Sequence, residues 1–345
     1  MVKVAIDISP LSTGHRLRGI GAYTAGLVEE FKNGNYGLDL EFFENPAKPP
    51  PADIIHYPYF DLFFHTLPTK KNSNRVVTIH DVIPLVFPTY FPKGAKGYIN
   101  LFFQKRALQN TDFVICDSQT SRLDVIEKLS YSQDKIKVIY LAAGKNFKKI
   151  DDKATLAKTL QKFTLPRDFA IYVGDVNWNK NLEGLLESVK IAKINLVMVG
   201  AALKDSGLEQ TKNLVAKINK LGLERRIFMT GLVSEQDLIH LYNLAKVTVL
   251  PSFYEGFGLP VLESFSCGMP VVCSNVSSLR EIGANLATYC DPQEPSDIAK
   301  KIKEAIGFSE QKRELFSRSA IKYASRYTWG KVARQTVEVY KKVTK

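Results

Sequence analysis

Short apolar runs, rich in valine and isoleucine and mostly unbroken by polar residues, recur along the chain and alternate with amphipathic segments. A strand carries such an unalternated run when helices cover both faces of its sheet, as they do in parallel sheets. The repeated rhythm of strand and helix therefore predicts an α/β fold built on parallel sheets. The predicted strands are Val2–Ile8, Asp53–Tyr57, Arg75–His80, Phe113–Cys116, Ile136–Leu141, Phe169–Val173, Leu196–Val199, Ile227–Met229, Val247–Leu250 and Pro270–Cys273.

The chain is long enough for two such sheets. Its 345 residues exceed what one ordinary hydrophobic core organises, and the runs fall into two series. The segment Gly144–Lys153 between the series is polar and charged, which is typical of a domain boundary. We therefore expect one domain over residues 1–148 and a second over residues 149–331, followed by a helical pattern that runs to the end of the sequence.

The charge balance favours anionic partners. Lysine and arginine number 47 against 35 aspartates and glutamates, which gives a formal net charge of +12. Nucleotide phosphates, nucleic acids and acidic membrane surfaces all fit such a surplus, and so does a charged surface that serves only solubility. The charge by itself does not distinguish between these possibilities.

Cysteine spacing and hydropathy bear on location. The four cysteines form neither a C-x-x-C pair nor a zinc-like cluster with histidines, so we expect buried thiols in a reducing cytoplasm. No apolar run approaches the roughly 18–20 residues that span a bilayer, and the first residues lack the layout of a signal peptide. The expected location is therefore cytoplasmic.

One stretch, FYEGFGLPVLESF at residues 253–265, combines two acids with glycines and a proline directly after a predicted strand. Ligands bind beyond the carboxyl ends of strands in open α/β sheets, so this stretch is expected at a binding edge. Pro260 suits the first turn of a helix and Gly268 suits its end. These two residues predict a short helix over Pro260–Cys267.

The loop before this helix is suited to a nucleotide-sugar. Backbone N–H groups and the positive end of the helix dipole attract phosphate, and Gly256 and Gly258 let a ligand approach the backbone. Glu255 and Glu263 supply carboxylates that accept hydrogen bonds from sugar hydroxyls. A plainer interpretation stays open, in which Glu263 complements the helix N-terminus and Glu255 is a solvated loop acid.

The spacing of these acids, with GFGLPVLE after Glu255, resembles the E-x7-E signature of retaining glycosyltransferases of the GT-B architecture, in glycosyltransferase family four. The surrounding VTVLPSFYEGFGLPVLESFSCGMPVVCSN is similar over its whole length. The resemblance implies two Rossmann-like domains that face a cleft, with the nucleotide-sugar bound mainly by the second domain and the acceptor by the first. It also implies that the last helix, 332–345, returns to the first domain. The donor-binding residues that it implies in this stretch are Glu255, Gly256, Phe257, Gly258, Leu259 and Glu263.

A second constellation, IYVGDVNWNKNLEGLLES at residues 171–188, ends a predicted strand in a glycine and places a lysine just before a helix. A mobile cation there suits a diphosphate, and the resemblance implies that Lys180 with Asn181 holds the diphosphate of the donor. Many family members carry an arginine directly after the glycine, where this chain has Asp175. The candidates for a replacement cation are Arg18, Arg75 and Lys145.

Two further candidates lie in the first domain. His80 ends a predicted strand and precedes Asp81, and the resemblance implies a catalytic role for it as a positioning group near the donor sugar, against the plain interpretation of a core or loop histidine. Gly19 and Gly21 follow the first strand, but the third glycine of a dinucleotide fingerprint is missing. By resemblance, the loop that contains these two glycines approaches the donor or the acceptor.

We expect no metal cofactor and possible contact with a membrane surface. No Asp-x-Asp or histidine-rich site ends a predicted strand, so amides, Lys180 and a helix dipole are expected to neutralise the leaving diphosphate. The segment 87–106 interleaves aromatic residues with lysine and arginine. It fits either an interfacial helix on an acidic membrane or a core helix with a cationic rim.

These features predict a retaining, metal-independent hexosyltransferase that uses a nucleotide-sugar. IHDVIPLVFP together with EGFGLP resembles bacterial mannosyltransferases of surface polysaccharide assembly, which favours GDP-mannose as donor and a glycan or lipid-linked glycan as acceptor. A UDP-sugar-dependent glucosyl- or N-acetylglucosaminyltransferase of the same fold is the alternative. A nicotinamide oxidoreductase would need the missing fingerprint, and a nucleic-acid-binding protein rests on the charge alone.

Overall fold

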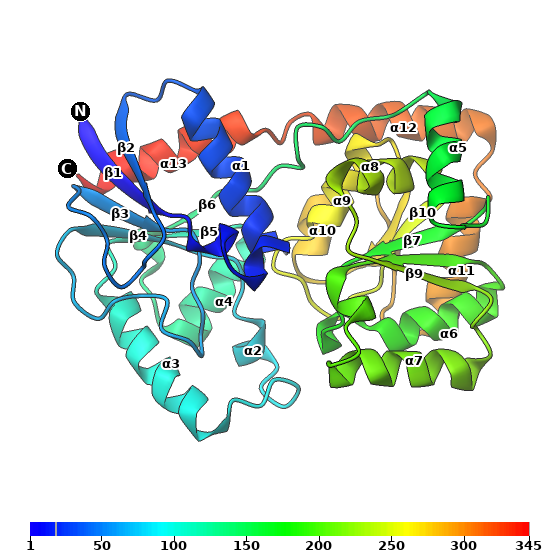
Figure 1. Cartoon of the computed structure of the whole chain (residues 1–345), viewed down its shortest axis with the longest axis horizontal. Coiled ribbons are helices and arrows are strands. Elements are labelled where there is room, and N and C mark those ends of the chain that lie inside the picture. Colours follow the sequence, from blue (N-terminus) through cyan, green and yellow to red (C-terminus); the bar gives the residue numbers. More distant parts are fainter. Residues whose placement is uncertain (18, 345) are drawn as a thin grey trace. The chain divides into compact units, whose positions relative to one another are not determined.

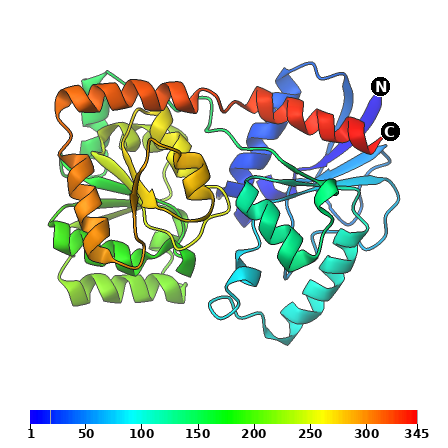
Figure 2. The ribbon, with the colours of Figure 1, turned by 180° about the vertical axis from the view of Figure 1, so that it is seen from behind.

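The computed structural model describes residues 1–17 and 19–344, which form two compact units (Figure 1). Unit 1 comprises Met1–Ala142 and Tyr327–Lys345, and unit 2 comprises Ala143–Arg326. Unit 1 is therefore built from two separate stretches of the chain, and unit 2 from a single stretch between them. Figure 2 shows the same ribbon from behind.

Each unit contains a six-stranded sheet in which all neighbouring strands pair in parallel. The strand order is β2-β1-β3-β4-β5-β6 in unit 1 and β12-β11-β10-β7-β8-β9 in unit 2. The predicted α/β class with two parallel sheets is confirmed. The strands of unit 1 are β1 (Val2–Asp7), β2 (Leu38–Phe43), β3 (Ile54–Tyr57), β4 (Asn74–Ile79), β5 (Phe113–Cys116) and β6 (Ile136–Val138), and those of unit 2 are β7 (Ala170–Val173), β8 (Leu196–Val199), β9 (Ile227–Gly231), β10 (Val247–Leu250), β11 (Val271–Ser274) and β12 (Thr288–Cys290).

Two strands, β2 and β12, escaped prediction, and both lie at the edge of a sheet. Residues of β2 alternate between apolar side chains and the acids Asp39 and Glu41, and none of them is fully buried. An edge strand is covered less completely than a central one, so β2 can carry acids and lack an unbroken apolar run, and β12 is only three residues long.

Helices cover both faces of each sheet (Figures 1 and 2). In unit 1, α1 and α13 lie together on one face while α3 and α4 lie on the other. In unit 2, α6, α7 and α11 share one face, and α5, α8, α9 and α12 share the opposite face. The α-helices are α1 (Gly19–Asn33), α2 (Ile83–Val86), α3 (Gly94–Gln109), α4 (Gln119–Leu129), α5 (Lys153–Lys162), α6 (Leu182–Ala192), α7 (Glu209–Leu221), α8 (Glu235–Leu244), α9 (Leu259–Ser266), α10 (Ser277–Gly283), α11 (Pro295–Ile306), α12 (Glu310–Ala324) and α13 (Trp329–Val343), and the 3-10 helices are η1 (Ser9–Leu11), η2 (Gly14–Leu17), η3 (Gln133–Lys135), η4 (Trp178–Lys180) and η5 (Ala201–Lys204).

The last helix, α13, is tied into unit 1 by a buried polar network. Tyr340 lies 2.7 Å from Nδ1 of His56, Nε2 of His56 lies 2.9 Å from Thr78 Oγ1, and Tyr23 reaches the same hydroxyl at 2.9 Å. Burial lowers the pKa of His56 to about 3, so its ring is neutral, with one nitrogen donating and the other accepting. His56 is therefore a satisfied core histidine whose hydrogen bonds join α13 to the centre of the sheet.

Gly26 and Trp329 set the distance between α1 and α13. Trp329 is buried, and a Cβ at Gly26 would lie 2.3 Å from two carbons of its indole ring. The helices therefore pack at a separation that leaves no room for a side chain at this position of α1.

We expect Gly26→Ala to lower the free energy of unfolding by about 1–3 kcal/mol, because overpacking against Trp329 outweighs the better helix propensity of alanine. Gly19→Ala in the same helix is the matched control, since its Cβ would meet no atom within 4 Å. Urea unfolding of both variants measures the difference. The packing argument is wrong if Gly26→Ala proves as stable as Gly19→Ala.

Candidate functional site

The candidate site of unit 2 lies where the order of its strands reverses. Strands β7 and β10 are neighbours in the sheet, but the chain continues from β7 to one edge and from β10 to the other. Their helical connections leave on opposite faces, so the loops after the two carboxyl ends flank a crevice, the position where open α/β sheets bind ligands. These loops are residues 174–181 and 251–258.

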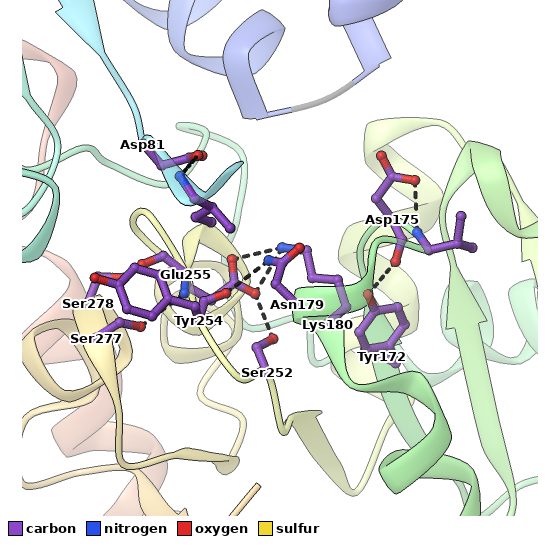
Figure 3. A network of polar contacts seen from close by, with 12 residues as sticks. Asp81, Tyr172, Asp175, Asn179, Lys180, Ser252, Tyr254, Glu255, Ser277 and Ser278 are labelled. Atoms are coloured by element: carbon purple, nitrogen blue, oxygen red, sulfur yellow. Dashed lines mark hydrogen bonds and ion pairs between the residues drawn. The ribbon is translucent and has the colours of Figure 1, made fainter. Parts of the chain in front are cut away.

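Glu255 and Lys180 meet between these loops (Figure 3). Lys180 Nζ donates to both carboxylate oxygens of Glu255, at 2.8 and 2.7 Å, and Ser252 Oγ donates to Oε1 at 2.7 Å. The side chains of Lys180 and Glu255 are only 21% and 10% exposed. Glu255 is therefore a buried, paired carboxylate, and the interpretation of a solvated loop acid is wrong.

The two loops are joined by further contacts around Asn179. Phe253 N–H donates to the Asn179 carbonyl at 2.8 Å, and Asn179 Nδ2 donates to the Tyr254 carbonyl at 2.9 Å. The rings of Trp178 and Phe253 stack with centroids 5.0 Å apart. These contacts fix the backbone on both sides of the ion pair, so Lys180 and Glu255 are held by a rigid frame.

Asn181 is used fully by the protein itself. It adopts a left-handed conformation with φ of 52°, caps α6 by accepting from Gly184 N–H, and donates from Nδ2 to the carbonyls of Pro251 and Pro292. These bonds use both amide hydrogens of its side chain, so Asn181 has no donor left for a ligand. The geometry of Asn181 fits a residue that positions Lys180.

Helix α9 begins and ends almost as predicted, at Leu259 and Ser266, one residue before each predicted bound. Pro260 is in its first turn, and Gly268, with φ of 73°, follows its end. Gly258 precedes it with φ of 96°, and a Cβ there would lie 2.8 Å from Leu279. Phe257 is buried, so this glycine-containing loop is packed tightly against unit 2 before the helix starts.

Glu263 lies in the second turn of α9 and differs from Glu255 in its environment. Tyr242 on α8 donates to its Oε2 at 2.7 Å, and no lysine or arginine pairs with it in the described part of unit 2. Burial raises the pKa of the Glu263 carboxyl to about 7. Glu263 is therefore partly protonated near neutral pH, whereas Glu255 faces a cation.

The position after the β7 glycine carries an acid with a local structural role. Asp175 accepts from Val176 N–H at 2.8 Å, and its carbonyl accepts from Tyr172 O–H at 2.6 Å. Arg75 cannot serve as the replacement cation as it stands, because it is buried in unit 1 with its guanidinium bound to the carbonyls of Lys70 and Ala107. Arg18 lies outside the described residues, and Lys145 lies in the segment of unit 2 before α5.

His80, directly after β4 in unit 1, has both ring nitrogens occupied. Nδ1 contacts a carboxylate oxygen of Asp117 and Nε2 lies 3.0 Å from the Pro58 carbonyl, two groups that accept hydrogen bonds. Burial lowers the pKa of His80, but the charge and hydrogen bond of Asp117 outweigh that effect and raise it above its usual value. Both ring nitrogens of His80 thus face acceptors within unit 1, an arrangement that favours the protonated ring.

Gly21 and Gly19 differ in their surroundings. A Cβ at Gly21 would lie 2.5 to 2.6 Å from backbone atoms of His15 and Arg16, so this glycine permits the close approach of α1 to η2. Gly19 has no atom within 4 Å of such a Cβ and is exposed. Both glycines lie in unit 1, on the chain that follows β1.

Three site residues escaped the sequence analysis: Asn179, Ser252 and Ser277. A lone asparagine or serine carries no recognisable pattern, although Asn179 directly precedes the predicted Lys180. The residues Ser278-Leu279-Arg280-Glu281 have the sequence spacing of a capping box, but α10 begins at Ser277 with Val276 as its N-cap, and Ser278 Oγ donates to the Glu255 carbonyl at 2.9 Å. Ser234, by contrast, does cap its helix, because its hydroxyl accepts from Asp237 N–H at the start of α8.

Comparisons with known proteins agree with this organisation. Residues 155–323 match the family described as glycosyl transferases group 1, and residues 40–142 match glycosyltransferase family 4. The O-antigen chain mannosyltransferase B of Escherichia coli is 31% identical over 84% of this chain and 74% of its own length. The serotype-specific mannosyltransferase WbdA of Escherichia coli is 29% identical, and the chain spans about a third of that protein, 35%.

Solved structures share the fold over nearly the whole chain. The sucrose-phosphate synthase of Thermosynechococcus elongatus has a TM-score of 0.76 at 18% identity, covering 99% of both chains. HepE of Anabaena, solved in complex with UDP and glucose, also has a TM-score of 0.76, at 19% identity and 99% coverage of both chains. At these identities the likeness concerns the fold.

The raised pKa of Glu263 predicts a pH-dependent contribution to stability. A carboxyl whose pKa rises from 4.5 to about 7 on folding stabilises the protein fully below about pH 4.5, and this contribution is lost as the pH rises through 7. Relative to Glu263→Gln, the wild type should therefore lose up to about 3 kcal/mol of unfolding free energy between pH 5 and pH 8. Urea unfolding across this range measures it.

A constant difference between Glu263→Gln and the wild type from pH 5 to pH 8 would contradict the assignment of the raised pKa.

Proposed function

The chain belongs to the group 1 glycosyl transferases, and we propose that it transfers mannose from GDP-mannose to a glycan or lipid-linked glycan in surface polysaccharide assembly. The observation that carries the proposal is the buried Lys180–Glu255 pair at the strand-order reversal, next to the loop that enters α9. The relatives named as O-antigen mannosyltransferases support mannose and a polysaccharide acceptor. Retention of configuration and independence from metal ions are parts of the same proposal.

In this proposal the donor binds unit 2, and its diphosphate, ribose and transferred sugar each contact different residues of the site. The diphosphate takes the position next to Lys180 and the start of α9, where a cation and the helix dipole stabilise negative charge. Glu263 accepts a hydrogen bond from a ribose hydroxyl, and Glu255 accepts one from the transferred sugar. Lys180 then neutralises the diphosphate as the bond between the sugar C1 and its phosphate oxygen breaks.

The acceptor hydroxyl must lose its proton during the reaction, and in this mechanism the departing phosphate accepts it. The acceptor oxygen forms its bond to C1 on the face that the phosphate leaves, and a phosphate oxygen takes the acceptor proton. His80 is not assigned as the base, because both of its ring nitrogens contact acceptors within unit 1. Within the described residues, no three His, Cys, Asp or Glu side chains gather where they could hold a metal ion.

The second candidate is a UDP-sugar as donor. HepE, which shares the fold, was solved with UDP and glucose, and this observation favours UDP-glucose as the competing donor. A thermal-shift comparison of GDP, GDP-mannose, UDP and UDP-glucose distinguishes them, since a ligand at a hundred times its Kd stabilises the folded state by roughly 2.7 kcal/mol.

We expect GDP-mannose to give the larger shift, and turnover with it to persist in excess EDTA. A larger shift with UDP-glucose would replace the donor, and activity restored only by Mg²⁺ or Mn²⁺ would overturn the metal-independent mechanism.

The two glutamates should separate binding from turnover. At pH 8, where its carboxyl is mostly ionised, Glu263→Gln should weaken GDP and GDP-mannose alike, by about tenfold to a hundredfold, because a hydrogen bond to a charged group is worth roughly 1.5–3 kcal/mol. Glu255→Gln should leave GDP affinity nearly unchanged and lower kcat, because its contact is with the reacting sugar. Calorimetry and initial rates measure both, and equal weakening of GDP by the two variants would contradict this division of roles.

We further propose that helix α3 docks on an anionic membrane surface. Tyr98, Ile99, Phe102 and Phe103 are 41% to 63% exposed, while α3 buries a different stripe that includes Leu101 and Leu108. The segment 87–106 thus contains a core helix along its buried stripe, while Tyr98, Phe102 and Phe103 lie outside the core. No helix formed by residues 1–17 and 19–344 has the length and apolar content needed to cross a bilayer.

The charge of α3 favours acidic lipid over other apolar partners. The helix contains Lys96, Lys105 and Arg106 and no aspartate or glutamate, and Lys93 lies over the Tyr98 ring at 5.2 Å. Asn100 of α3 donates to the Phe63 carbonyl, and the next residue, Phe64, is 70% exposed, so the loop held by α3 carries a further exposed aromatic side chain. Apolar anchors among cations are the composition of an interfacial helix.

A double variant, Tyr98→Ser with Phe102→Ser, should lower affinity for phosphatidylglycerol vesicles by about tenfold or more, because each aromatic side chain withdraws apolar area from water. Vesicle co-sedimentation at low and high salt measures this, and the wild type should bind pure phosphatidylcholine much less. Leu123→Ser, at a 60% exposed leucine of α4, is the control and should bind like the wild type. Equal binding by the double variant would refute the docking surface.

A further inference from the structure

The backbone of Glu255 is held on both sides by the start of α10. Glu255 N–H donates to Ser277 Oγ at 2.9 Å, and Ser278 Oγ donates to the Glu255 carbonyl at 2.9 Å. Both serines lie beside Glu255 in Figure 3, opposite the lysine that binds its carboxylate. Ser252 in the preceding loop donates to the carboxylate, so three serine hydroxyls contact this one glutamate.

Ser277 adopts a backbone conformation that serines rarely occupy, with φ of 47°. The other non-glycine residues of the described chain with positive φ follow the end of a helix, although Asn181 also caps the start of α6 and Ala284, with ψ of −129°, lies outside the left-handed region. Ser277 instead is the first residue of α10. The N-cap of this helix is Val276, which makes no side-chain capping bond. The residues at helix ends are Ser130, Thr164, Asn181, Lys193 and Ala284.

Neither packing nor capping accounts for the conformation of Ser277. Its side chain is only partly buried, so its hydroxyl fills no core position. The bond that its conformation does provide is the one to Glu255 N–H. Backbone strain of this kind persists at sites where the surrounding structure requires one particular geometry.

We propose that Ser277 is a positioning residue, whose strained backbone aims Glu255 at the transferred sugar. The inference rests on the proposed function, because it takes Glu255 as the sugar contact. Without the Ser277 hydroxyl, water can satisfy the Glu255 N–H, but the backbone of the glutamate loses one of its fixed points. A displaced reacting group lowers the rate of the chemical step more than it lowers ground-state binding.

The decisive variant is Ser277→Gly, which removes the hydroxyl and at the same time relieves the strained conformation. Glycine adopts positive φ without steric cost, so the melting temperature should stay the same or rise. We expect kcat to fall by between about tenfold and a hundredfold, while the affinity for the bare nucleoside diphosphate stays unchanged. The variant would then be as stable as the wild type or more stable, yet less active. A merely structural role of Ser277 would not produce this combination.

Ser130→Gly is the matched control, because Ser130 has φ of 53° at the C-terminal end of α4 in unit 1. It should show the same change in melting temperature with unchanged kcat. Ser277→Asn should recover part of the lost kcat, because asparagine tolerates positive φ and offers an acceptor oxygen. An unchanged kcat in Ser277→Gly, or a joint fall of melting temperature, nucleotide affinity and kcat, would overturn the proposal.

Hydrogen exchange separates this inference from the proposed function. In the wild type the Glu255 amide should exchange slowly, and in Ser277→Gly the peptide covering residues 253–258 should exchange faster while the rest of unit 2 is unchanged. This readout needs no substrate. Failure of every nucleotide-sugar to turn over would overturn the proposed function alone, whereas unchanged exchange in Ser277→Gly would overturn the fixing of Glu255.

Discussion

The buried ion pair between Lys180 and Glu255 joins two loops whose residues are 75 positions apart in the sequence. Burying two opposite charges is costly unless their geometry is well satisfied, and here a serine hydroxyl and the crossed hydrogen bonds of Asn179 supply that geometry. The pairing of β7 with β10 brings the loops together, and the parallel direction of the strands puts both charges at one edge of the sheet. The ordinary α/β architecture of unit 2 therefore sets the conditions under which the charges can be buried.

The sequence predicted those parts of the fold that local rules determine. Central strands carry unbroken apolar runs, and Pro260 and Gly268 bracket α9 because proline and glycine restrict the backbone by themselves. The edge strands β2 and β12 lack that run. The serines beside Glu255 lay beyond prediction for another reason: Ser278 satisfies the local spacing of a capping box, yet its hydroxyl bonds to a carbonyl 23 residues away. Such partners become visible only when the chain has folded.

The two acids of the E-x7-E stretch show how the environment divides one residue type into two states. The Glu255 carboxylate accepts from the Lys180 ammonium group and the Ser252 hydroxyl, whereas the Glu263 carboxylate accepts from the Tyr242 hydroxyl on the neighbouring helix. One carboxylate is compensated by charge, and the other has its pKa raised towards neutrality by burial. The spacing of the acids in the sequence gave their positions but not this difference, which depends on Lys180 and Tyr242 from distant segments.

Unit 1 is completed by residues that follow all of unit 2 in the chain. Until α13 is synthesised, His56 lacks its Tyr340 partner, and the face of α1 that receives Trp329 stays open to water. Unit 2 is one continuous stretch of the chain, so it needs no residues that are synthesised after it. During synthesis, unit 2 can therefore reach its native state first, while unit 1, whose six strands are already made, keeps an uncovered face until α13 follows. The order in which the ribosome delivers the chain thus makes the unit that begins first the one that folds last.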